Sequence, residues 1–159
     1  MGTEQIGTSL SHEYSTPLSL VSELIEEFDL HIDVAASAQN AKLPHYWTIK
    51  DDALSKTWKG NCWINPPYSR DLKKWVKKAH SERHSGTKVC LIPVRSNTKW
   101  WSEVCRDSEI RFINGEVNFN DSPRGLWAAL CIMIFGEGAK VGTFSVIDYR
   151  KGKLLKNGL

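Results

Sequence analysis

Segments with strand periodicity alternate with segments with helical periodicity along most of this sequence, and that alternation limits the fold more than any other feature. Apolar residues recur at helical spacing after Ser15-Thr16-Pro17, which predicts a helix start with a hydroxyl cap and a proline in the first turn. The other expected helices are residues 37–43, 69–84 and 96–106. The expected strands are residues 31–35, 61–64, 88–94, a short pair within 109–119, 126–135 and 141–149.

Strands joined by helices in this way predict an α/β fold, with parallel strands at the centre of the sheet and helices flanking it. Antiparallel strands are expected in the C-terminal part, where the last two strands are expected to run antiparallel around residues 136–138. The 159 residues fit one domain. We expect that domain to comprise residues 15–159, and the polar residues 1–14 to form a mobile arm.

The composition argues against several classes of protein. The four cysteines are scattered without a C-x-x-C pair, so no structural zinc site is expected. Cys62, Cys90 and Cys131 lie in apolar runs, which is typical of reduced, buried thiols. Residues 1–10 carry no secretory signal pattern, and the longest apolar run, residues 126–135, is too short for a membrane-spanning helix. We therefore expect a cytoplasmic protein.

Basic residues gather around one expected helix, although the net charge of the chain is only +3. The basic block comprises Lys73, Lys74, Lys77, Lys78, His80, Arg83, His84 and Lys88. A basic surface attracts polyanions such as nucleic acids. A lysine-rich face is also the ordinary solvated side of a surface helix, and the block alone leaves both interpretations open.

The tetrapeptide Asn65-Pro66-Pro67-Tyr68 follows directly on the expected strand 61–64. Two consecutive prolines cannot continue a central strand, so the chain leaves the sheet there. Asp33-Val34-Ala35 stands at the end of another expected strand, and ligands of open α/β sheets bind beyond the carboxyl ends of the strands. Both segments are therefore candidates for one site, although Asn-Pro and Pro-Pro also occur in ordinary turns.

The chemistry of this loop suits the activation of an aromatic amine. The lone pair of adenine's exocyclic amino group is delocalised into the ring, which makes the amine a poor nucleophile. The side-chain oxygen of Asn65 and the carbonyl of Pro66 can accept hydrogen bonds from that amine and favour a tetrahedral nitrogen. Tandem prolines hold such carbonyls rigidly, and Tyr68 offers a stacking surface for a flipped base. No covalent intermediate and no Cys62 thiolate are expected.

Several segments together resemble the phage-type DNA N6-adenine methyltransferase family, over roughly residues 14–135. The segments that carry the resemblance are residues 14–17, 33–38, 40–42, 51–55, 58–60, 63–69 and 91–101. The resemblance implies a compact Rossmann-like methyltransferase fold that transfers a methyl group from S-adenosylmethionine to adenine N6 in DNA. It also implies that the catalytic loop is Asn65, Pro66, Pro67 and Tyr68.

The resemblance also implies roles for residues outside that loop. The implied cofactor site comprises Thr16, Pro17, Asp33, Ala35 and Ser37, with Asp51 or Asp52 accepting from the cofactor's adenine or ribose. Contacts to DNA are expected from Lys73, Lys74, Lys77, Lys78, Arg95 and Thr98. Arg95 and Thr98 fit equally well a helix start that packs the tryptophans after it.

Two features depart from the wider pattern of methyltransferases. The first strand is followed by no glycine-rich turn, a trait that the phage-type family tends to share, and Asn97 stands where relatives tend to have aspartate. Cytosine-N4 methylation and a catalytically silent DNA-binding protein on the same fold are the alternative functions. Few residues remain for a separate target-recognition domain, so we expect a short or relaxed recognition sequence, or one to which a homodimer contributes.

Overall fold

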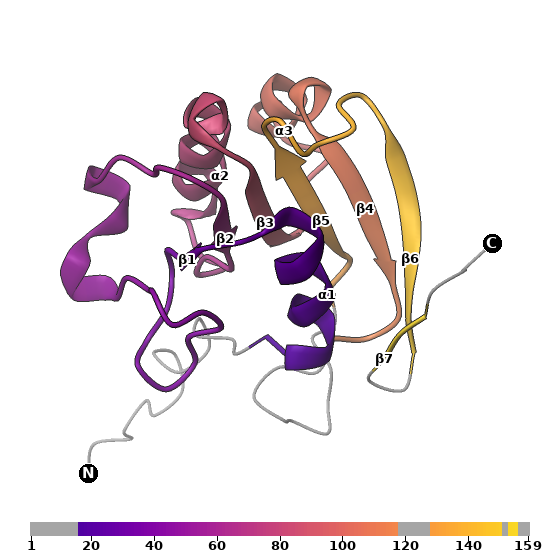
Figure 1. Cartoon of the computed structure of the whole chain (residues 1–159). Helices are drawn as coiled ribbons and strands as arrows, with labels where there is room; N and C mark the ends of the chain where they lie inside the picture. Colours follow the sequence, from indigo (N-terminus) through magenta and orange to yellow (C-terminus); the bar gives the residue numbers. More distant parts are fainter. Residues whose placement is uncertain (1–15, 118–127, 151–152, 156–159) are drawn as a thin grey trace, which may run out of the picture.

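A seven-stranded mixed sheet forms the centre of the protein (Figure 1). The computed structural model describes residues 16–117, 128–150 and 153–155. The strands are β1 (Ile32–Asp33), β2 (Cys62–Ile64), β3 (Lys88–Pro93), β4 (Glu109–Asn114), β5 (Leu130–Phe135), β6 (Phe144–Arg150) and β7 (Lys153–Leu155). Their order across the sheet is β1-β2-β3-β5-β4-β6-β7.

Five of the strands within the described residues run in one direction. β1, β2 and β3 pair in parallel, as do β4 and β6, whereas β5 and β7 run the opposite way. The sheet is thus mostly parallel, with the antiparallel strands in the C-terminal part. This arrangement, with helices on both faces, confirms the predicted α/β fold.

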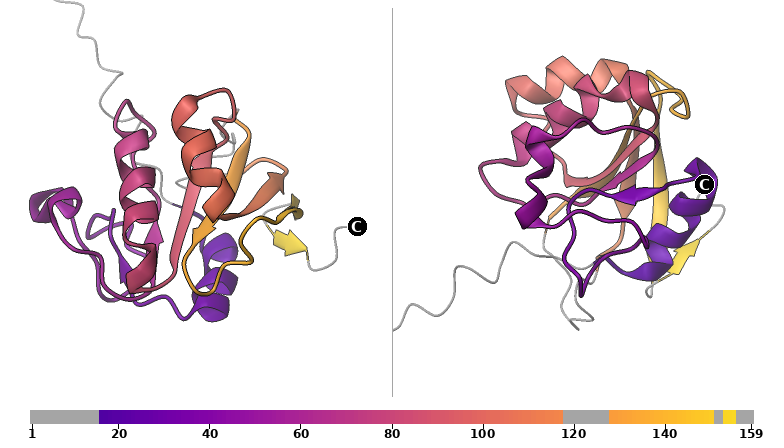
Figure 2. Two further views of the ribbon diagram at one scale, coloured as in Figure 1. Left: turned by 90° about the horizontal axis from the view of Figure 1, so that it is seen from above. Right: turned by 60° about the vertical axis from the view of Figure 1, so that its left-hand side comes forward.

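Helices cover the two faces of the sheet unequally (Figure 2). The helices are α1 (Leu18–Phe28), α2 (Leu72–Ser81) and α3 (Lys99–Val104), with short 3-10 turns η1 (Ile49–Asp51), η2 (Ala53–Ser55), η3 (Arg83–Ser85) and η4 (Cys105–Asp107). α1 packs on one face and contributes to one apolar cluster, whereas α2 and α3 pack on the other face and contribute to a second. Along the described segments, no helix is long and apolar enough to cross a membrane.

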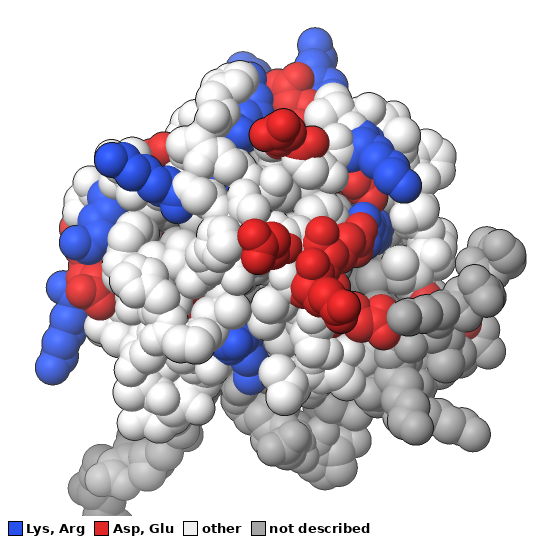
Figure 3. All heavy atoms as spheres, viewed as in Figure 1, with Lys and Arg blue, Asp and Glu red and all other residues white. Residues whose placement is uncertain are grey.

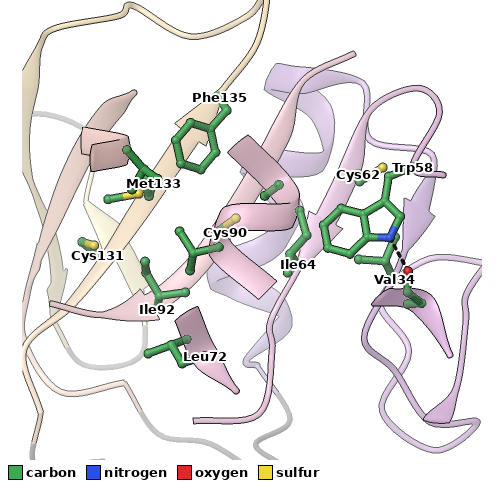
Figure 4. Close-up of a cluster of buried hydrophobic side chains, with 14 of the residues drawn as sticks. Val34, Trp58, Cys62, Ile64, Leu72, Cys90, Ile92, Cys131, Met133 and Phe135 are labelled. Carbon is green, nitrogen blue, oxygen red and sulfur yellow. Dashed lines mark hydrogen bonds between the residues drawn. The ribbon is translucent and has the colours of Figure 1, made fainter. Parts of the chain in front are cut away.

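The alternation of side chains along β2 separates these two clusters. Cys62 and Ile64 point toward α2, whereas Trp63 lies in the cluster beneath α1. Figure 4 shows Cys62, Ile64 and Cys90 beside Trp58 and Phe135 on the α2 face. Cys62, Cys90 and Cys131 are free, buried thiols, as the sequence predicts.

The predicted pairing of the last two strands is wrong, because β4 lies between β5 and β6. The connection between them is attached to the start of β4: the Gly142 N–H donates to the Ser108 carbonyl, and the Ile110 N–H donates to the Thr143 carbonyl. These bonds hold residues 142 and 143 against the start of β4, so that β6 pairs with β4 and not with β5. The predicted pair of strands within 109–119 is a single strand, β4, as far as residue 117; residues 118 and 119 lie outside the described residues.

Two local predictions near the N-terminus also differ from the structure. Residues 37–43 form turns instead of a helix, because the side chains of Ser37 and Asn40 accept hydrogen bonds from each other's backbone N–H groups. At α1, Pro17 is the N-cap residue and no side chain caps the helix. The hydroxyl of Thr16 instead accepts a hydrogen bond from Asn65. Ser15 and the expected arm at residues 1–14 lie outside the described residues.

Candidate functional site

The parallel pairing of β1 and β2 brings the two predicted strand ends to the same edge of the sheet. Asp33 is in register with Trp63, so Ala35 and Asn65 both follow strands that end side by side. Both residues line a small hollow of about 10 Å³. The two segments that the sequence singled out are therefore adjacent in space, beyond the carboxyl ends of β1 and β2.

Asn65 is held by a side chain from a distant part of the chain. Its Nδ2 donates to Thr16 Oγ1 over 2.9 Å, and its Oδ1 is buried. With the nitrogen engaged in this way, Oδ1 is the atom through which the amide can accept a hydrogen bond from another molecule.

The rest of the loop is rigid and packed. Pro66 is buried and Pro67 is partly buried. The hydroxyl of Tyr68 donates to the Leu91 carbonyl in β3 over 3.1 Å, and the half-buried ring packs against both apolar clusters. The loop therefore leaves the sheet with its aromatic side chain fixed to the neighbouring strand.

Asp33 organises the loop that follows β1. The residue is 3% exposed, and its carboxylate accepts hydrogen bonds from the N–H groups of Ala35 and Lys42 at 3.3 and 3.0 Å. Burial raises the pKa of this carboxyl above its ordinary value, while these two bonds act in the opposite sense. Asp33 thus closes the loop and also lines the small hollow beside Asn65.

A larger pocket of about 270 Å³ adjoins this hollow. Its lining combines apolar and polar groups: Val34, Ala35, Ala36, Asn40, Thr48, Ile49, Asp52, Ala53, Leu54, Pro67, Asp71 and Trp75. Ala35 and Asn40 line both spaces, so the pocket and the hollow are neighbours. The pocket thus extends from the turns η1 and η2 to the loop that contains Asn65.

Two more open hollows, of about 400 and 350 Å³, lie at the opposite edge of the sheet. Gly86 and Glu137 line both of them, and Gly86 precedes β3. They therefore lie where strands begin. Because ligands of open α/β sheets bind where strands end, the pocket near Asn65 is the better candidate.

The structure separates the two neighbouring aspartates that the sequence left as alternatives. Asp51 is part of the capping box at the start of η1, in which its carboxylate accepts hydrogen bonds from the N–H and the hydroxyl of Thr48. These bonds lower the pKa of the Asp51 carboxyl, the N–H bond most. Asp52 lines the pocket and adopts a left-handed backbone conformation with φ 49°. Aspartate adopts this conformation more readily than most other non-glycine residues, and Asp52 is the C-cap residue of η1.

The remaining predicted cofactor residues lie near the hollow with different roles. Thr16 lines it, and Pro17 is the N-cap of α1. The N–H of Ser37 donates to Asn40 Oδ1 over 2.6 Å, which closes a turn beside the pocket. Ser37 itself is not among the described lining residues of either space.

Most of the predicted DNA contacts also have structural partners. Lys74, Lys77 and Lys78 form ion pairs with Asp71, Glu103 and Glu82, each at 2.9 Å. Thr98 caps α3 by accepting from the Trp101 N–H. Lys73 and Arg95 are exposed, and the described part of the chain records no ion pair for either.

Sequence reasoning missed several lining residues of the pocket, among them Asn40, Asp71 and Trp75. Asn40 stands seven residues after Asp33, in a loop that periodicity cannot place. Asp71 and Trp75 are one helical turn apart at the start of α2, which follows the Asn65 loop directly. That spacing puts both on one side of the helix and was the available signal.

Cys62 lies in β2, just before the Asn65 loop. Burial raises the pKa of the Cys62 thiol to about 11, so at neutral pH it is protonated. This agrees with the expectation that Cys62 is no nucleophile. Across the residues that the structure describes, no group of three or more His, Cys, Asp or Glu side chains is arranged to hold a metal ion.

Comparison with known proteins gives a consistent result. The DNA N-6-adenine-methyltransferase (Dam) family matches residues 5–132. A DNA N-6-adenine-methyltransferase of Haemophilus phage HP1 is 36% identical over 102 residues, which cover 57% of this chain and 57% of the relative. One of Escherichia phage T1 is 29% identical over 110 residues, covering 65% of this chain and 45% of the relative. The chain thus spans about half the length of these curated relatives. Because the family match covers most of its length, the chain belongs to the DNA N-6-adenine-methyltransferase (Dam) family.

Proposed function

We propose that this protein methylates the exocyclic N6 amine of adenine in DNA, with S-adenosylmethionine as the methyl donor. The observation that carries the proposal is the position of Asn65-Pro66-Pro67-Tyr68, at a strand end beside a pocket of about 270 Å³. Family membership and the activity for which both phage relatives are named support it.

In this proposal the loop acts by hydrogen bonding and positioning. Asn65 Oδ1 and the Pro66 carbonyl accept hydrogen bonds from the two amine hydrogens, which favours a tetrahedral nitrogen whose lone pair is less delocalised into the ring. Because the loop is fixed by its prolines and by the Tyr68–Leu91 bond, it orients the amine with little loss of conformational entropy. Tyr68 provides a stacking surface for the flipped base.

The pocket lining fits the proposed cofactor. When bound, S-adenosylmethionine supplies a methyl group on a positively charged sulfonium. Ile49, Leu54 and Trp75 offer apolar contact for its purine, and the carboxylate of Asp52 is an acceptor for a ribose hydroxyl or an amino group. Ala35 at the boundary with the hollow lets a ligand approach the backbone closely.

Asp52→Asn is expected to weaken S-adenosylmethionine binding about tenfold. A hydrogen bond to a neutral acceptor is weaker than one to a carboxylate by about 1.4 kcal/mol, which corresponds to a factor of about ten in affinity. Asparagine tolerates the left-handed backbone of residue 52, so the variant tests charge and not strain. Asp51→Asn is the matched control and should bind with parental affinity. Calorimetric titration measures both; equal affinities for the two variants would contradict the assignment of Asp52.

The charge distribution favours an approach of DNA away from α1. Figure 3 shows acidic side chains gathered over α1, which carries Glu23, Glu26 and Glu27. A phosphate backbone is repelled from such a face. We therefore propose that DNA is bound at the strand-end edge beside α2, with Lys73 and Arg95 in contact with phosphate.

In a plot of the logarithm of DNA affinity against the logarithm of salt concentration, Lys73→Ala is expected to lower the steepness of the slope by about one unit. One lost phosphate contact produces a change of this size. Lys77→Ala is the control on the same helix, because Lys77 is paired with Glu103 and should change the slope less. Fluorescence anisotropy titrations over a range of salt concentrations measure both. Equal slopes for the parent and Lys73→Ala would remove Lys73 from the DNA interface.

The proposed function is tested by incubating the protein with labelled S-adenosylmethionine and unmethylated DNA, followed by nucleoside analysis. N6-methyladenine is the expected product. N4-methylcytosine would show that the loop acts on the other aromatic amine. DNA binding without transfer to any DNA would favour a silent binding protein.

A further inference from the structure

The side chain of Asn65 contacts Thr16, a residue that is distant from it in the sequence. Asn65 Nδ2 donates to Thr16 Oγ1 over 2.9 Å, although the two residues are 49 positions apart in the sequence. Thr16 is 2% exposed, so the contact is shielded from water. A shielded hydrogen bond between a catalytic-loop amide and a hydroxyl holds its orientation more strongly than an exposed one.

The alternation of side chains along β2 and the position of α1 bring Asn65 and Thr16 together. Side chains along β2 alternate between the two faces, with Trp63 on the α1 face and Ile64 on the α2 face. Asn65 continues that alternation toward α1. Thr16 stands just before Pro17, the N-cap of α1, and α1 is fixed to the sheet by Leu20 and Leu24 in the same cluster as Trp63.

The contact matters because the two ends of a primary amide have nearly the same shape but opposite hydrogen-bonding character. Turned by 180°, Asn65 would present its NH2 group to the NH2 group of the target, and neither could accept. The Thr16 hydroxyl accepts from the nitrogen and thereby holds the oxygen in the accepting position.

We propose that Thr16 is a positioning residue that sets the orientation of the Asn65 amide for methyl transfer. The inference rests on the proposed function, and it differs from the cofactor contact that the resemblance implies for Thr16. A cofactor contact acts on cofactor affinity. A positioning contact acts on kcat, because it selects the productive rotamer of Asn65.

The test compares Thr16→Val, which keeps the shape but removes the hydroxyl, with Thr16→Ser, which keeps the hydroxyl. Thr16→Val is expected to lower kcat about tenfold, which corresponds to the loss of one hydrogen bond to the reacting amide. The KM for S-adenosylmethionine should stay at the parental value, and Thr16→Ser should restore most of kcat. Parental kcat in Thr16→Val, or a raised KM with unchanged kcat, overturns the proposal.

A second measurement separates this inference from the proposed function. The side-chain NH2 signals of Asn65 in a nitrogen-15 NMR spectrum are identified by their loss in Asn65→Ala. They should move in Thr16→Val and return toward the parental position in Thr16→Ser, whether or not the protein methylates DNA. Absence of methyl transfer by the parent contradicts the proposed function alone, whereas unmoved Asn65 signals in Thr16→Val overturn the positioning role.

Discussion

Asn65→Ala is expected to lower the rate of methyl transfer at least about a hundredfold, in the range found when one preorganised hydrogen-bonding group is removed from an active site. The variant loses the side-chain acceptor and keeps the loop prolines. Single-turnover transfer of labelled methyl to DNA measures the effect. Parental rates in Asn65→Ala would remove the proposed mechanism.

Asn61→Ala is the matched control, because Asn61 is also a partly buried asparagine and stands next to the other end of β2. Its Nδ2 donates to the Phe28 carbonyl, and its Oδ1 accepts from the Thr87 N–H. Loss of these bonds should lower the free energy of unfolding without a specific loss of kcat. Asn65→Asp adds a second comparison, because a carboxylate keeps an acceptor oxygen in either orientation and should transfer methyl faster than Asn65→Ala.

The sequence predicted the parts of the site that depend on local chemistry. Tandem prolines after an apolar strand must leave the sheet, so Asn65 could be placed at a strand end from sequence alone. Asp33 could be placed at a strand end because the expected strand 31–35 ends in small residues. Their adjacency then followed from the parallel pairing of β1 and β2, which α/β periodicity already indicated.

The sequence could not predict features that depend on distant pairing or on one backbone angle. The insertion of β4 between β5 and β6 arises from bonds made by residues 140–143 to the start of β4, which no local pattern reveals. Asp51 and Asp52 have the same side chain, and only the capping box and the left-handed φ of residue 52 distinguish them. Likewise, the sequence predicted that Thr16 caps a helix, whereas its hydroxyl accepts a hydrogen bond from Asn65, which only the tertiary structure brings near.

The second large effect is expected at Trp58, which joins the core to the pocket wall. Trp58 is fully buried and its Nε1 donates to the Ala53 carbonyl over 2.8 Å (Figure 4). Its ring lies 5.9 Å from that of Trp75. Ala53 and Trp75 both line the pocket. The side chain therefore supports two walls of the proposed cofactor site from behind.

Trp58→Ala is expected to lower the free energy of unfolding by about 3–5 kcal/mol, the usual cost of truncating a buried aromatic side chain. It should also weaken S-adenosylmethionine binding, because Ala53 and Trp75 lose their support. Urea denaturation and calorimetric titration measure the two effects. A loss of stability below about 1 kcal/mol would contradict the structural role of Trp58, since surface substitutions already reach about half that value.

Two further variants separate packing from cofactor contact. Trp58→Phe keeps a ring but removes the indole donor to Ala53, whose carbonyl still accepts from the Lys56 N–H. A loss of about 0.5–1.5 kcal/mol in the free energy of unfolding is therefore expected for the one lost hydrogen bond. Trp75→Ala removes a pocket-lining side chain that is only partly buried, so it should weaken cofactor binding more than it lowers stability. If Trp75→Ala instead binds S-adenosylmethionine with parental affinity, the cofactor does not contact the side chain of Trp75 on α2. In that case the weaker cofactor binding of Trp58→Ala is explained by the loss of support for Ala53 in η2 alone.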